Sequence, residues 1–128
     1  MVALTNINSS FIALKEYEKA IENTTISINY FKENNETRFV AQAMQMRAQA
    51  YADKGESDRA MTDYKNSLKL FDEVQSNENI MFSYNAIGSL YLEKNDVLKA
   101  EETLLRAKKI GEQYSYNTNL SNTYGLLG

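Results

Sequence analysis

The chain has 128 residues, of which 43% are hydrophobic and 24% charged, and its formal net charge is −3. This length suits one domain with its own core, and the acidic balance argues against a nucleic-acid-binding surface, which normally carries a basic excess. The sequence contains no Cys and no His, which excludes disulfides, His- or Cys-based catalysis and the usual structural zinc site. No apolar run approaches the roughly 20 residues of a membrane helix, and the first residues show no signal-peptide pattern.

Apolar residues recur along the chain at the three- and four-residue spacing of a helix face, and strand-type alternation is hard to find. The absence of Pro removes the strongest helix breaker. The pattern therefore predicts an all-α chain in which short turns join about seven helices. In chain order, these helices cover about residues 2–13, 16–33, 37–54, 57–75, 78–93, 96–114 and 117–128.

Two of the predicted turns contain residues that favour helix ends. Gly55 and Asn95 suit the left-handed conformation that closes a helix, and Ser57 and Asp96 suit the N-cap of the helix that follows. The first predicted turn, at residues 14–15, has no residue of either kind. The sequence thus predicts the later hairpins more clearly than the first.

The sequence also repeats itself, with a period of about 40 residues. Small residues let two antiparallel helix backbones approach closely, and large aromatic residues fill the volume beside them. One aromatic column and two columns of small residues follow this repeat, which predicts stacked helical hairpins. The columns are Phe11, Tyr51 and Tyr91, then Ala20, Ala60 and Ala100, then Ser27, Ser67 and Ala107.

The repeat divides the chain into residues 1–40, 41–80 and 81–120 and a partial fourth repeat at 121–128, all within a single domain. We expect the natural protein to continue past this partial repeat. Leu120, Tyr124 and Leu127 lie on one face of the last segment, and no second helix follows to cover them. Because repeat stacks need capping units, we expect this face either to form a homodimer contact or to fray.

The third repeat resembles the tetratricopeptide repeat family most clearly, through Gly88, Tyr91, Ala100, Leu104 and Ala107. The period is longer than the roughly 34 residues of the common tetratricopeptide repeat, and the usual terminal Pro is missing. HEAT repeats are the rival interpretation, because their period is also about 40, but they usually carry Pro. The longer period is similar to that of kinesin light chain and of bacterial signalling proteins. The resemblance implies an α–α superhelix (a solenoid) that acts as a binding scaffold, without enzymatic activity or a cofactor.

In tetratricopeptide arrays the first helix of each repeat lines an inner groove where a protein or peptide binds. By this resemblance, the groove residues are Thr5, Ser9, Gln42, Gln45, Gln49, Phe82, Asn85 and Ser89. Apart from Gln42 and Phe82, they form uncharged polar pairs one helical turn apart, which suit an extended peptide backbone. Family members that clamp a terminal carboxylate use Lys or Arg here, so that ligand is not expected. The alternative is that these residues are polar only because the groove is wet.

Charged residues offer no clear site. Acidic residues at Glu16, Glu18 and Glu22, and at Glu101 and Glu102, are expected on solvated helix faces. Basic residues between positions 94 and 109 interleave with acidic ones, which indicates helix-surface ion pairs rather than a nucleic-acid site.

Arg47 stands in the column of Ile7 and Ile87, where the repeat pattern has an apolar residue. We expect its side chain to reach the edge of the helix or to pair with Asp53 or another neighbour.

Together these features predict a protein- or peptide-binding module, the sensory or assembly region of a bacterial signalling protein. One alternative is the peptide-receptor domain of a transcriptional regulator. Another is an accessory domain of a histidine kinase or a similar signalling enzyme. We expect a cytoplasmic location, or a periplasmic one if a signal or membrane segment precedes the chain.

Overall fold

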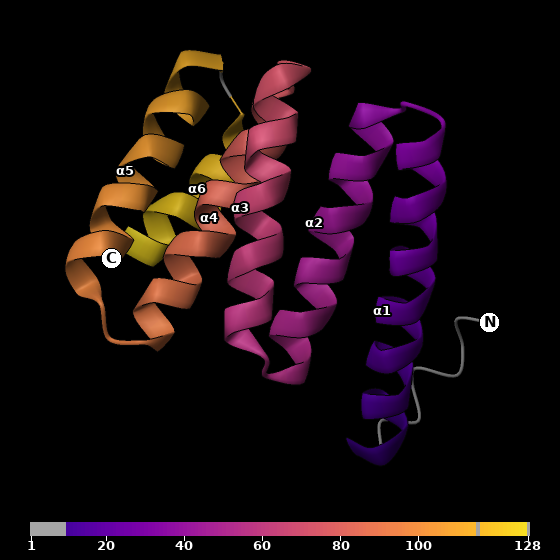
Figure 1. The fold of residues 1–128 in the computed structure, drawn as a ribbon. Helices are drawn as coiled ribbons and strands as arrows, with labels where there is room; N and C mark the ends of the chain where they lie inside the picture. Colours follow the sequence, from indigo (N-terminus) through magenta and orange to yellow (C-terminus); the bar gives the residue numbers. More distant parts are fainter. Residues whose placement is uncertain (1–9, 115, 128) are drawn as a thin grey trace. The chain divides into compact units, whose positions relative to one another are not determined.

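The computed structural model describes residues 10–114 and 116–127, and it describes side chains for residues 15–114, 116 and 120–127. The described residues form helices and short turns without a strand, so the predicted all-α fold is confirmed (Figure 1). None of these helices is both long enough and apolar enough to cross a membrane. The helices are α1 (Ser10–Glu33), α2 (Thr37–Lys54), α3 (Ser57–Glu73), α4 (Asn77–Glu93), α5 (Val97–Tyr114) and α6 (Asn117–Leu127).

The chain divides into two compact units, Met1–Asp63 and Tyr64–Gly128, and the boundary falls inside α3. In the first unit, α1 packs against α2. In the second unit, α5 packs against α4 and α6, and α4 also contacts α6. Each unit is therefore held together by helices that follow one another closely in the sequence.

The turns recur at half the period of the sequence columns. Asn35, Gly55, Gln75 and Asn95 are evenly spaced along the chain, and all have positive φ, from 57° to 96°. After each of them, the next backbone N–H donates to the carbonyl five positions earlier, at 2.8–3.0 Å, which closes the helix end as a Schellman motif. The prediction that Gly55 and Asn95 end their helices is confirmed.

One predicted turn and one predicted N-cap are wrong. The predicted turn at residues 14–15 is absent, because α1 runs unbroken from Ser10 to Glu33. Lys15 lies as far before Asn35 as Asn35 lies before Gly55, so the spacing of the turns would place a turn there. Lys has neither the backbone freedom of Gly nor the tendency of Asn to adopt the left-handed conformation. Ser57 is the first residue of α3 rather than its N-cap, which is Glu56. Asp96 does cap α5, because its Oδ1 accepts the Lys99 backbone N–H at 3.3 Å.

Small residues mark the tightest packing. Ala60 and Ala100 are both 0% exposed, as close helix packing in their column requires. A Cβ added to Gly88 would lie 2.6 Å from two carbons of the Leu104 side chain. At this separation the Leu104 side chain must shift, so the approach of α4 to α5 depends on glycine there.

The last helix is covered more fully than the sequence predicts. Leu120 of α6 is only 8% exposed and packs in a cluster with Met81 of α4 and Ala107 of α5. The prediction that Leu120 is left uncovered is therefore wrong, because the preceding hairpin already supplies its packing partners. Tyr124 remains 46% exposed, and its hydroxyl donates to Glu112 Oε2 at 2.8 Å. The proposed homodimer contact through this helix remains a prediction.

Candidate functional site

One face of α2 combines apolar side chains with amides. Phe39 is 44% exposed and Met46 is 64% exposed, and Gln42 and Gln49 follow them at helical spacing on the same stripe. Gln45 lies at the edge of this stripe and is half-buried. We call the stripe formed by Phe39, Gln42, Gln45, Met46 and Gln49 the α2 face.

The structure gives Gln49 a partner on its own helix. Its side-chain amide donates to Asp53 Oδ1 at 3.0 Å, one turn further along α2. Because both groups lie on the surface, a ligand can compete for this amide at low cost. That Gln42, Gln45 and Gln49 bind a ligand remains a prediction.

The predicted groove residues of α4 differ in accessibility. Phe82 is 40% exposed, and Ser89 is half-buried. Asn85 is only 8% exposed, and its Oδ1 accepts the Thr123 hydroxyl of α6 at 2.6 Å. Asn85 thus helps to hold α6 in place, and its role toward a ligand remains a prediction. The predicted groove residues Thr5 and Ser9 lie outside the described residues.

Arg47 joins all three helices of the first unit. Its Nε donates to Asp63 Oδ2 at 2.7 Å, and its Nη2 donates to Asp63 Oδ1 at 2.9 Å. Its Nη1 donates to Thr25 Oγ1 of α1 at 3.0 Å. The expectation that Arg47 pairs is confirmed, but the partner is Asp63 and not Asp53. The hydrogen bond to Asp63 raises the pKa of Arg47 above its ordinary value.

This ion pair lies in a shallow cleft of about 360 Å³ in the first unit. Tyr51 forms part of the lining, and the guanidinium carbon of Arg59 lies 5.8 Å from the centre of its ring, within range of a cation–π contact. The lining charges balance, because Arg47 and Arg59 face the same number of carboxylates, those of Asp58 and Asp63, so the cleft carries no net charge.

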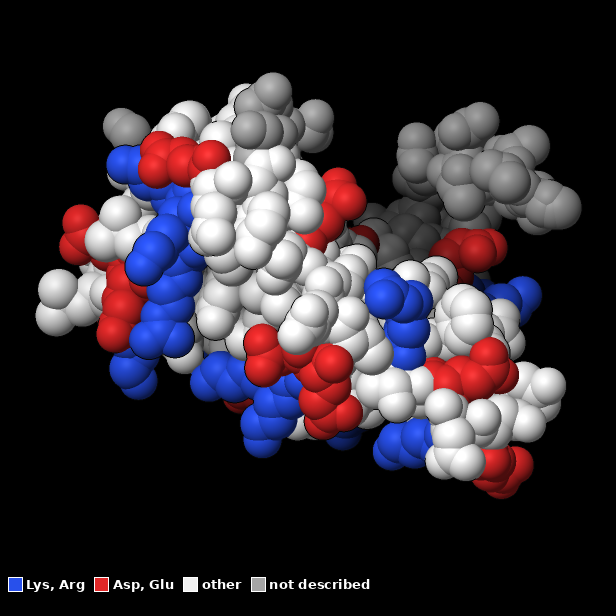
Figure 2. All heavy atoms as spheres, turned by 90° about the horizontal axis from the view of Figure 1, so that it is seen from above, with Lys and Arg blue, Asp and Glu red and all other residues white. Residues whose placement is uncertain are grey.

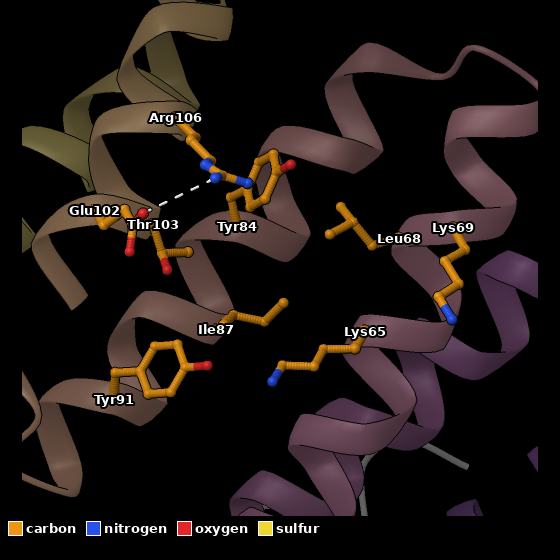
Figure 3. Close-up of a pocket in the computed structure, with 9 residues that line it drawn as sticks. All are labelled: Lys65, Leu68, Lys69, Tyr84, Ile87, Tyr91, Glu102, Thr103 and Arg106. Carbon is orange, nitrogen blue, oxygen red and sulfur yellow. Dashed lines mark ion pairs between the residues drawn. The ribbon is translucent and has the colours of Figure 1, made fainter. Parts of the chain in front are cut away.

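A second cleft of about 350 Å³ lies within the second unit, between residues of α3, α4 and α5. Figure 3 shows α4 side chains between the α3 and α5 side chains that form its walls. We call this the basic cleft, because three of its lining residues are cations and one is an anion. The lining residues are Lys65, Leu68, Lys69, Tyr84, Ile87, Tyr91, Glu102, Thr103 and Arg106.

The charges around the basic cleft are exposed and only loosely paired. Arg106 Nη2 lies 4.0 Å from Glu102 Oε2, and their side chains are 62% and 69% exposed. Such a pair contributes about 0–1 kcal/mol, so an incoming ligand can displace it. The ammonium groups of Lys65 and Lys99 lie 5.7 and 5.9 Å from the ring centre of Tyr91, within range of cation–π contacts.

The two clefts share part of their lining in the sequence repeat, where Arg47, Tyr51, Thr62 and Asp63 correspond to Ile87, Tyr91, Glu102 and Thr103. Tyr51 and Tyr91 correspond, and so do the cations that contact them, Arg59 and Lys99. Ile87 takes the place of Arg47 in the basic cleft, which gives that cleft an apolar floor instead of an internal ion pair.

Sequence reasoning did not find the basic cleft. Lys65, Leu68 and Lys69 lie within about one turn of α3, which is a weak signal in a chain with many surface lysines. The cleft exists only because α5 brings Arg106 opposite them, and this depends on packing.

Of the acidic residues expected on solvated faces, four are exposed, namely Glu18, Glu22, Glu101 and Glu102, and Glu16 is half-buried. Glu18 has a side chain that is 64% exposed and lies 3.7 Å from Lys54 Nζ. Lys54 Nζ also contacts Glu56 at 2.9 Å, and this contact lowers the pKa of Glu56. Among the described residues, no group of three acidic side chains is placed to hold a metal ion. Lys99 Nζ lies 3.9 Å from Asp96 Oδ2, as the interleaved charges predict. Figure 2 shows Lys and Arg beside Asp and Glu on the visible face.

Consecutive helices that pack on one another and repeat along the sequence define a helical-repeat protein, a class that binds other molecules along its helix surfaces. The family model for the tetratricopeptide repeat matches residues 41–73 and 83–113, which together make up half of the chain. The chain therefore belongs to the tetratricopeptide repeat family, and the resemblance drawn from the columns is confirmed. Such repeats generally mediate protein–protein interactions and are typically non-catalytic. No curated protein and no solved structure matches the chain significantly.

Proposed function

We propose that this chain is a peptide-binding scaffold whose ligand lies along the α2 face. The observation that carries the proposal is the exposure of Met46, at 64%, and of Phe39, at 44%, on a stripe that also holds glutamine side chains. A face that is polar only because it is wet needs no large apolar side chains. Met is common at adaptable binding surfaces, because its side chain is flexible and polarisable.

The amides give the proposed ligand its hydrogen-bonding partners. Gln42, Gln45 and Gln49 each carry a donor and an acceptor, so they can pair with both the N–H and the C=O groups of an extended backbone. In the second unit, Phe82 and Ser89 stand at the repeat positions of Gln42 and Gln49, and we infer that they can bind a peptide in the same way along α4. The similarity of the period to repeats of bacterial signalling proteins supports a place in the sensory or assembly region of such a protein.

The test starts from peptides selected against the whole chain from a displayed random library. We expect Gln45→Glu with Gln49→Glu to abolish their binding, because two carboxylates replace two amides that both donate and accept. The matched control is Asn23→Asp with Asn29→Asp, which adds the same charge at exposed positions of α1. Circular dichroism checks that each variant is folded. Equal binding by both double variants would refute the role of the α2 face.

A further inference from the structure

We propose that the basic cleft is a second binding site, separate from the α2 face, that takes an acidic peptide segment of a partner protein through an apolar side chain flanked by carboxylates. The inference goes beyond the proposed function, because it concerns other residues and other chemistry. It rests on the apolar floor of the cleft and on the charge along its walls.

The floor can accept an apolar side chain. Ile87 and Tyr91 of α4 line it, and Leu68 of α3 adds a further apolar contact. A volume of about 350 Å³ lies at the lower end of the range of pockets that bind small ligands. It is large enough for one aromatic or branched side chain, and burial of that side chain against Ile87 and Leu68 would supply the apolar part of the affinity.

The walls select for negative charge. Lys65, Lys69 and Arg106 line the cleft with only Glu102 to oppose them, so the cleft carries a positive excess in a chain whose net charge is −3. The positions that correspond to the three cations one repeat earlier hold Thr25, Asn29 and Asn66. The basic excess is therefore specific to this part of the chain and does not follow from the repeat pattern.

The placement of the cations favours a peptide over a ligand with a single anionic head. Lys65 and Lys69 are one helical turn apart on α3, and Arg106 lies on the opposite wall, on α5 (Figure 3). Positive charge is therefore distributed along both sides of the apolar floor. Several carboxylates along a peptide can form ion pairs with all three cations, whereas a single carboxylate can pair with only one or two of them.

The test measures binding of a capped peptide with a central phenylalanine between glutamates to the whole chain, by fluorescence anisotropy. Two comparison peptides replace the glutamates by lysines or the phenylalanine by serine. We expect only the acidic phenylalanine peptide to bind well, and its binding to weaken as salt is raised, because exposed charges are screened.

Charge reversal on both walls, by Lys69→Glu with Arg106→Glu, should weaken binding of this peptide by about tenfold. The matched control, Lys19→Glu with Lys109→Glu, reverses two exposed charges outside the cleft and should change binding by less than about twofold. Gln45→Glu with Gln49→Glu should also leave binding nearly unchanged, which separates this site from the α2 face. Loss of binding in the control double variant to the same extent would overturn the proposal. The proposal would also be overturned if the chain bound decanoate tightly but did not bind the peptide, and if Lys69→Glu with Arg106→Glu weakened the decanoate binding.

Discussion

Replacing Arg47 by Ile and Asp63 by Thr, singly and together, tests how the first unit is stabilised. These substitutions copy Ile87 and Thr103, which occupy the equivalent positions one repeat later. In the wild type, the side chain of Asp63 is 6% exposed and that of Arg47 is 20% exposed, and two hydrogen bonds join them. Removing one partner leaves the other buried without its counter-charge.

We expect each single substitution to lower the free energy of unfolding by about 2–3 kcal/mol, slightly less than for a fully buried pair, because Arg47 keeps some contact with water. The double variant should lie within about 1 kcal/mol of the wild type, since replacement of a buried pair by well-packed residues is often neutral. Urea denaturation of the four proteins gives the coupling energy directly. Additive losses in the double variant would refute the reasoning, because they would show that the pair contributes no mutual stabilisation.

Three further predictions concern the turns, the packing and the pH dependence. Gly55→Ala should lower the free energy of unfolding by about 1–2 kcal/mol through backbone strain alone, since a Cβ there meets nothing within 4 Å. Gln75→Gly should raise the free energy of unfolding in the same urea assay. If both variants changed it in the same direction, the role of positive φ would be contradicted. Ala100→Leu should overpack its 0% exposed site and cost about 1–3 kcal/mol, and an unchanged melting temperature would count against it. The contact with Lys54 lowers the pKa of Glu56 in the folded protein. The stabilisation that ionised Glu56 gives the folded state is therefore fully present above the ordinary glutamate pKa and is lost as pH falls through the folded pKa. The urea midpoints of wild type and Glu56→Gln should therefore converge in acid, and a constant difference would contradict this.

Much of the fold could be predicted from local residue chemistry. Gly55 and Asn95 marked helix ends because each tolerates positive φ, and the small columns marked the close helix approaches. Gln75 also adopts positive φ, but a glutamine carries no such signal. The unbroken α1 was missed for a related reason: the repeat implied a turn that the residues at positions 14–15 do not encode.

The candidate sites depend on packing between distant residues, and this limited their prediction. Arg47 and Asp63 lie on different helices, and only the approach of α2 to the start of α3 brings them together. Residue spacing on α4 predicts Asn85 as an accessible groove residue, but Thr123 of α6, which is distant in the sequence, covers it and donates a hydrogen bond to it. The three glutamines of the α2 face could be predicted because they lie on one helix, where residue spacing alone determines which side chains share a stripe. Phe39 and Met46 were not among the predicted groove residues, because the sequence does not show that these large apolar side chains stay exposed.

The central claim, that the chain binds peptides along the α2 face, is tested most directly by mapping amide chemical shifts with a library-selected peptide. The account predicts that the largest changes fall at Gln42, Met46 and Gln49, and that they disappear in the variant with Gln45→Glu and Gln49→Glu. Changes confined to other surfaces, and unaffected by that variant, would contradict it.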